Sequence, residues 1–122
     1  MSEHTSDQHV SDAVSLAQAV RSGRTTALTV MEASLRRADD QTALGAITVL
    51  DAQMVETARA WDGAGGAVKS TPFAGVPFLA KSLGNHAKGL KVSAGSRAIA
   101  ARTTAQSVDS ELFARFRRAG LL

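Results

Sequence analysis

The fold that this sequence predicts depends on one stretch, Pro72-Phe73-Ala74-Gly75-Val76-Pro77-Phe78-Leu79-Ala80-Lys81. Residues 76–80 form a continuous apolar run, which is typical of a β-strand that is buried on both faces. Pro77 has no N–H to donate to a neighbouring strand, so it belongs at the beginning of the strand or at an edge. We therefore expect a buried strand that ends at Lys81.

Helices are predicted on both sides of this strand. Three of them precede it: residues 12–22 with Ser11 as N-cap, residues 27–39 with Thr26 as N-cap, and residues 52–61 with Asp51 as N-cap. A last helix is predicted over residues 110–119, capped by Asp109 or Ser107 and stopped by Gly120. Each of these segments places apolar residues on one face, as a helix that covers a core requires.

Two shorter apolar runs predict further strands. Residues 46–50 are rich in β-branched side chains, and residues 121–122 read as the opening of another strand. Residues 62–72 and 82–97 contain glycines and no clear period, so we expect loops there. The predicted fold class is α/β, with helices packed on a mixed sheet that is incomplete within this chain and whose central strand carries Lys81.

The composition is that of an ordinary globular domain, with 44% hydrophobic and 20% charged residues in 122. We expect a flexible polar tail at residues 1–10 and one domain over residues 11–122. The absence of cysteine excludes a disulfide framework, a thiol nucleophile and a Cys-type zinc site. No apolar run reaches the length of about 20 residues that a membrane span needs, and no signal peptide is visible, so a cytoplasmic protein is expected.

Lys81 is the strongest candidate for chemistry. A buried strand would hold its amine away from water, which lowers the pKa of a lysine and gives a neutral amine that can act as a base. The alternative is structural, because most lysines at the end of a strand extend their ammonium into water. Residue spacing alone favours the structural alternative.

The remaining candidates lack the neighbours that their chemistry requires. His4, His9 and His86 have no partner at metal-ligand spacing, so neither a metal site nor a cofactor is predicted. The sequence contains no Ser-x-x-Lys and no Gly-x-Ser-x-Gly motif. The serines near the apolar stretch are therefore expected to be ordinary turn residues: Ser70, Ser82, Ser93 and Ser96.

The order of several segments resembles the N-terminal part of the amidase signature family. The segments are Phe73-Ala74-Gly75-Val76-Pro77-Phe78-Leu79-Ala80-Lys81, then Ala94-Gly95-Ser96-Arg97, then a helix ending in Arg117-Arg118-Ala119-Gly120. The resemblance extends over about residues 11 to 122. Within the family, residues 73–81 followed by Leu83-Gly84 are closer to bacterial amidases of the 6-aminohexanoate-cyclic-dimer hydrolase type than to the transfer-RNA amidotransferase subunit.

This resemblance implies a hydrolase that cleaves carbon–nitrogen bonds of a small-molecule amide without a cofactor. The family uses a lysine, a serine with a cis peptide bond and a second serine as nucleophile, and Lys81 matches the lysine. Ser82 stands where the family usually has Asp, and both catalytic serines of the family lie beyond residue 122 of this chain. We therefore expect residues 11–122 to be a truncated N-terminal part of an amidase domain that is inactive alone.

Two other functions remain open from the sequence. A non-catalytic helical interaction module would use the amphipathic helices and the unpaired edge of the unfinished sheet. A weakly basic nucleic-acid-binding domain would use Lys88, Lys91 and Arg97 at a net charge of +3, although no aromatic side chains interleave with them. The amidase interpretation excludes nucleic-acid and membrane partners and allows a homodimer of the complete protein.

Overall fold

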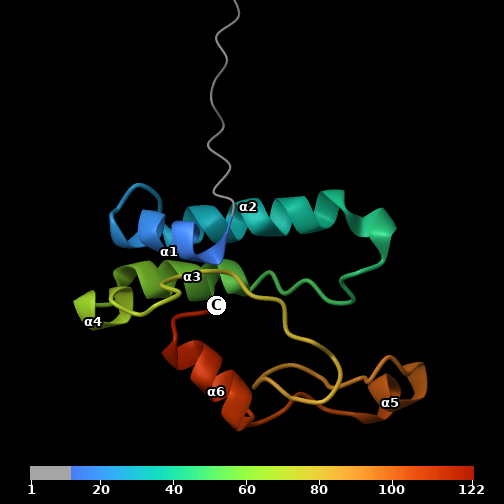
Figure 1. Ribbon diagram of the computed structural model, residues 1–122. Coiled ribbons are helices and arrows are strands. Elements are labelled where there is room, and N and C mark those ends of the chain that lie inside the picture. The colour runs from blue at the N-terminus through green and yellow to red at the C-terminus, as the bar shows by residue number, and fades with distance from the viewer. Residues whose placement is uncertain (1–11) are drawn as a thin grey trace, which may run out of the picture.

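Helices supply the regular structure of residues 12–122, which the computed structural model describes (Figure 1). In chain order they are α1 (Ala13–Arg21), α2 (Ala27–Asp40), the 3-10 helix η1 (Thr42–Leu44), α3 (Met54–Gly63), α4 (Gly66–Lys69), α5 (Arg97–Arg102) and α6 (Glu111–Arg118). The predicted tail at residues 1–10 and the predicted cap Ser11 lie outside the described residues. Within residues 12–122, no helix has both the length and the apolar character that crossing a bilayer requires.

The first two helices begin at side chains that accept hydrogen bonds from the first turn. The Ser15 N–H donates to Asp12 Oδ1 at 2.7 Å at the start of α1, and the Thr29 N–H donates to Thr26 Oγ1 at 3.1 Å at the start of α2. Such bonds satisfy N–H groups that have no partner inside the helix. The helices predicted over residues 12–22 and 27–39 are confirmed to within one residue at each end, and so is the cap Thr26. The predicted cap Ser11 is wrong, because Asp12 is the N-cap of α1.

The later helices differ from the predicted ones in their ends and caps. Helix α3 begins at Met54 rather than at residue 52, and it continues to Gly63. Helix α6 is capped by Ser110, which accepts a 3.4 Å hydrogen bond from the Phe113 N–H, so the predicted caps Asp109 and Ser107 are wrong. Helices α4 and α5 form within or at the end of stretches that were predicted to be loops.

The predicted α/β fold is wrong for residues 12–122, because no sheet forms there. The β pairing in this part of the chain is one isolated parallel bridge between Lys88 and Gln106. Residues 46–50 form a loop in which Val49 is 69% exposed, and residues 76–80 belong to no helix or strand. A strand needs hydrogen-bonding partners from elsewhere in the chain, and residues 12–122 supply no continuous ladder for either apolar run.

The hydrophobic core lies where α1, α2 and α3 meet, in the upper half of Figure 1. Its buried side chains come from these helices and from the turn at residues 72–75: Val20, Ala27, Val30, Met31, Ala58, Trp61 and Ala74. Trp61 is the largest of them and is 9% exposed. The last residue of the chain, Leu122, is half-buried and packs against the same core. The core therefore fixes both the turn at residues 72–75 and the end of the chain beside it.

Candidate active site

The segment of residues 76–81 carries the candidate base Lys81 at its end. It leaves the turn at residues 72–75 and runs beside the C-terminal end of the chain (Figure 1). Val76 is 5% exposed, but Phe78 is 42% and Leu79 is 66% exposed. The expectation of a strand buried on both faces is therefore wrong beyond Val76.

Backbone hydrogen bonds to the end of the chain hold this segment in place. The Leu122 N–H donates to the Val76 carbonyl at 2.9 Å, and the Phe78 N–H donates to the Leu122 carbonyl at 2.7 Å. In parallel strands, one residue bonds in this way to two residues of its neighbour that are two positions apart. Here Leu122 makes both of these bonds. The Phe78 ring also packs on Phe113 and Phe116 of α6, with ring centroids 6.1 and 4.9 Å away. Helix α6 and the residues that follow it thus position the segment that leads to Lys81.

Lys81 itself is exposed. Among residues 12–122, no carboxylate lies within ion-pair distance of its ammonium. Water therefore reaches the side chain from the open side of the segment. The dry environment that the sequence predicts for this amine is not formed by residues 12–122, because the apolar run beside it is itself exposed.

A tight turn at residues 93–96 contacts Ser82, the residue directly after Lys81. The Ala94 N–H donates to the Ser82 carbonyl at 2.9 Å, and the Ser96 N–H closes the turn on the Ser93 carbonyl at 2.8 Å. Ala94 and Gly95 both have positive φ, at 48° and 72°, which is the backbone geometry of a type I′ turn. These hydrogen bonds bring the turn at residues 93–96 against Ser82, the residue that follows Lys81. No local pattern of residues predicts this contact, because turn residues carry no periodicity.

A carboxylate ties the loop after Lys81 to α6. Asp109 accepts from the Lys88 backbone N–H at 2.7 Å and from Arg117 at 2.6 and 3.2 Å. The hydrogen bond from the Arg117 guanidinium is the main reason that the pKa of the Asp109 carboxyl lies below its ordinary value of 3.8. From the sequence, Asp109 is predicted only as a cap, because a spacing of eight residues to Arg117 is not that of a helical contact.

The other residues singled out in the sequence do not converge on Lys81. His86 is half-buried in the loop after it, and the His86 carbonyl accepts from the Ser110 N–H at 2.9 Å. Lys88, Lys91 and Arg97 are exposed. Within residues 12–122, no three histidine or carboxylate side chains are grouped so that they could hold a metal ion. His4 and His9 lie outside the described residues.

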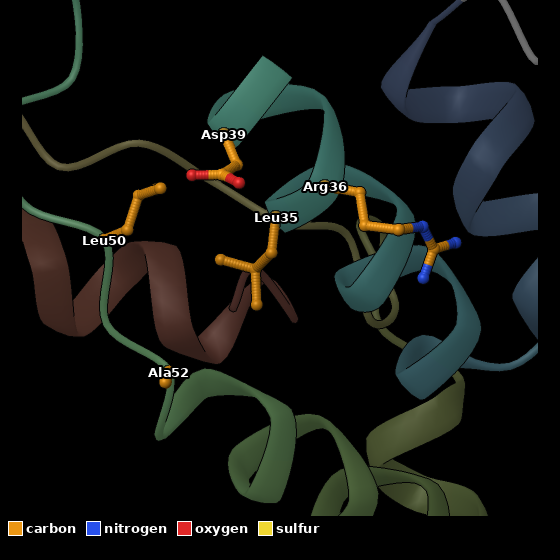
Figure 2. Close-up of a pocket in the computed structure, with 5 residues that line it drawn as sticks. All are labelled: Leu35, Arg36, Asp39, Leu50 and Ala52. Atoms are coloured by element: carbon orange, nitrogen blue, oxygen red, sulfur yellow. The ribbon is translucent and has the colours of Figure 1, made fainter. Parts of the chain in front are cut away.

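A shallow hollow of about 300 Å³ lies elsewhere, between the C-terminal half of α2 and the loop before α3. It is lined by Leu35, Arg36, Asp39, Leu50 and Ala52. Figure 2 shows Leu35, Leu50 and the Asp39 carboxylate around one space, with the Arg36 guanidinium turned away from it. None of these residues belongs to the segment that contains Lys81, so the hollow is not part of the candidate site.

Comparison with known protein families gives a match that includes the segment with Lys81. The family described as Amidase matches residues 29–122, which include α2, the 76–81 segment and α6. The chain belongs to the amidase family. A search of curated proteins found no match.

Membership in the amidase family supports an amidase-type function in general, the hydrolysis of amide bonds. The matched region begins inside α2 and contains the segments quoted for the resemblance between Phe73 and Gly120, but not residues 11–28, over which the resemblance was also predicted. The resemblance to this family is thus confirmed. The comparison does not distinguish between the types of amidase within it.

Proposed function

We propose that the chain contributes the lysine of an amidase active site, in which Lys81 is the base of a Ser-cisSer-Lys proton relay acting on a linear or cyclic small-molecule amide. In this scheme the nucleophilic serine passes its proton through the bridging serine to Lys81 Nζ as it attacks the amide carbonyl. The amine leaves with a proton, and water then hydrolyses the acyl-enzyme. With no cysteine in the sequence, we place this reaction in the reducing cytoplasm.

The family match over the 76–81 segment is the observation that carries the proposal. Two features of the geometry support it. Lys81 follows a segment that backbone hydrogen bonds of Val76 and Phe78 hold to Leu122, and its ammonium is in no ion pair within residues 12–122. The amine is therefore not engaged in a structural ion pair that it would have to leave in order to accept a proton from a serine.

The same geometry leads us to propose that these 122 residues do not hydrolyse amides on their own. A lysine acts as a base near neutral pH when its surroundings exclude water, and the side chain of Lys81 is exposed. The sequence also contains neither of the serine-nucleophile motifs considered above. A base without its nucleophile cannot complete acyl transfer.

Amide turnover by the purified chain tests the second proposal. We expect release of ammonia from hexanamide, and of p-nitroaniline from its anilide, to equal the buffer rate for the chain and for Lys81→Met alike. Turnover by the chain that the Lys81→Met change abolishes would contradict inactivity while supporting the role of the lysine. Turnover that survives the change would contradict both.

The role of Lys81 as base is tested by the coding DNA beyond the codon of Leu122. We expect a Gly/Ser-rich stretch there, in frame or after a frameshift, that supplies the two serines. In the polypeptide extended through that stretch, Lys81→Met and Lys81→Arg are each expected to lower kcat about 10²–10⁴-fold. Hydrolysis that persists in Lys81→Met, or DNA that encodes no such stretch, would overturn the proposal.

A further inference from the structure

Ala94 adopts a backbone conformation that is costly for its residue type. Among residues 12–122 it is the one residue other than glycine with a positive φ, at 48°. A left-handed conformation is strained for a residue with a Cβ, and this place in a type I′ turn is usually taken by Asn, Asp or Gly. Strain of this kind persists only where the surrounding structure holds it, and it is most frequent at functional sites.

The strained turn holds the residue that directly follows Lys81. The Ala94 N–H donates to the Ser82 carbonyl at 2.9 Å. Ser96, the last residue of the turn, is also the N-cap of α5, where its Oγ accepts from the Ile99 N–H at 3.3 Å. The turn is therefore fixed to α5 on one side and to Ser82 on the other.

Backbone hydrogen bonds flank Lys81 on both sides. Three residues before it, the Phe78 N–H donates to the Leu122 carbonyl at 2.7 Å, and one residue after it, the Ser82 carbonyl accepts the bond from the turn. Between these two bonds, residues 79–81 make no backbone hydrogen bond within the described part of the chain. Lys81 is also exposed, and its ammonium is in no ion pair with the described residues. The placement of its backbone therefore depends on the two flanking bonds, of which the bond to Ser82 is the nearer.

We propose that the turn at residues 93–96 is a positioning element that holds Lys81 in place for proton transfer. Ala94 supplies the N–H that holds Ser82, and Gly95 allows the turn to form. This inference rests on the proposed function, in which the Lys81 amine takes a proton from a serine. A proton passes between two groups that are within hydrogen-bond distance, and a misplacement of about 1 Å lowers the rate about 10²-fold. A loosened turn is therefore expected to lower kcat.

Gly95 and Gly23 offer a matched pair of substitutions. Their φ values are +72° and +74°, and no atom lies within 4 Å of a Cβ built on either residue. Valine is strained at both positions, since β-branched residues rarely adopt a positive φ. Only Gly95→Val places that strain in the turn, so Gly23→Val is the control for a general loss of stability. Ala94→Gly is the opposite change, because it relieves the strain and keeps the N–H that bonds to Ser82.

Nuclear magnetic relaxation of the backbone amides in the unextended chain measures the order that the turn imposes on Lys81. We expect the order parameter of the Lys81 N–H to be about 0.85 in the unaltered chain, in Gly23→Val and in Ala94→Gly, and to fall below about 0.6 in Gly95→Val. Helical circular dichroism is expected to be the same in all four proteins. An order parameter that Gly95→Val leaves unchanged, or that Gly23→Val or Ala94→Gly lowers equally, would overturn the inference.

Hydrolysis by the polypeptide extended beyond Leu122 tests the effect on the reaction. We expect Gly95→Val to lower kcat about 10–10²-fold at unchanged KM, and Gly23→Val and Ala94→Gly to keep the kcat of the unaltered protein. Full kcat in Gly95→Val, while Lys81→Met abolishes hydrolysis, would overturn the positioning role and leave the proposed function intact. A loss of kcat in Gly23→Val as large as in Gly95→Val would also overturn the positioning role. Hydrolysis that persists in Lys81→Met would instead overturn the proposed function, and the positioning role with it.

Discussion

Gly75 occupies a position in the core that leaves no room for a side chain. Its φ is +73°, in the left-handed region that glycine adopts at little cost. A Cβ at this residue would lie 2.8 Å from Ala27 Cβ, 3.2 Å from Trp61 Cζ3 and 3.3 Å from Val20 Cγ1. The turn into the 76–81 segment can therefore pass this close to α1, α2 and α3 only because residue 75 is glycine.

Gly75→Ala is expected to lower the free energy of unfolding by about 3 kcal/mol, from backbone strain of about 1 kcal/mol and overpacking of about 2 kcal/mol. Gly23→Ala is the control, because Gly23 has a φ of +74° but no atom within 4 Å of its added Cβ. Gly23→Ala should lower the free energy of unfolding only by the backbone strain of about 1 kcal/mol. Urea unfolding followed by Trp61 fluorescence measures both values, and equal losses in the two variants would contradict the packing argument.

At the scale of elements, the start of α2 is tied to the end of α3. The Ala27 and Leu28 N–H groups each donate to the Asp62 carboxylate at 2.9 Å. These are N–H groups of the first turn of α2, which have no partner inside the helix, and a negative charge there also favours the helix dipole. Thr26 caps the same turn through a third N–H, that of Thr29. The pairing of α2 with α3 thus has a polar anchor beside its apolar contact.

Asp62→Ala is expected to lower the free energy of unfolding by about 2 kcal/mol, because two part-buried N–H groups lose their acceptor. Asp62→Asn should lose less, since one amide oxygen remains to accept. Asp40→Ala, at the opposite end of α2, removes an exposed carboxylate from the negative end of the helix dipole and should leave the stability unchanged or higher. Thermal unfolding by circular dichroism ranks the three variants, and a loss in Asp40→Ala as large as in Asp62→Ala would contradict the anchor.

At the scale of the whole molecule, hydrogen bonds join the loop that follows Lys81 to the residues just before α6. The loop at residues 86–90 bonds to residues 106–110. The Gly89 N–H donates to the Gln106 carbonyl at 2.9 Å, and the Ser110 N–H donates to the His86 carbonyl at 2.9 Å. Asp109 adds its bonds to the Lys88 N–H and to Arg117, and its side chain is only 16% exposed. This carboxylate is therefore the polar group on which the placement of α6 against the loop most depends.

Asp109→Asn is expected to lower the free energy of unfolding by about 1–2 kcal/mol at pH 7. Because the Arg117 hydrogen bond depresses the pKa of Asp109 below 3.8 in the folded state, its contribution is complete above that pH and is lost as the pH falls through the folded value. The difference between the two proteins should thus be constant from pH 7 to about 5 and should shrink at pH 3 and below.

Urea unfolding at these pH values measures that difference. Glu111→Gln is the control, because Glu111 pairs with Arg115 and Arg118 on the exposed surface, where ion pairs stabilise little. A difference between the unaltered chain and Asp109→Asn that persists unchanged at pH 2 would show that the carboxylate charge is not responsible.

The sequence proposes Lys81 as the candidate residue but does not predict the surroundings in which the structure places it. Lys81 was found from a motif in a fixed order, and the amidase family match covers that motif. The apolar run of residues 76–80 predicts that Lys81 is buried. Such a run indicates that other residues must cover it, but it does not indicate whether those residues lie within this chain of 122 residues. Leu79 at 66% exposed shows that they do not.

The sequence by itself determined the helices α1 and α2 and the cap Thr26 of α2, because helix hydrogen bonds and capping side chains join residues three or four positions apart. The cap of α1 is Asp12, one residue after the predicted Ser11. The tertiary structure alone decided that the apolar runs at residues 46–50 and 76–80 form no sheet, that Asp62 anchors α2, and that Asp109 binds Arg117. Strands, and carboxylates such as Asp62 and Asp109 that bond across the fold, take their partners from other parts of the chain, and the local pattern of residues does not specify which segment comes within hydrogen-bonding reach.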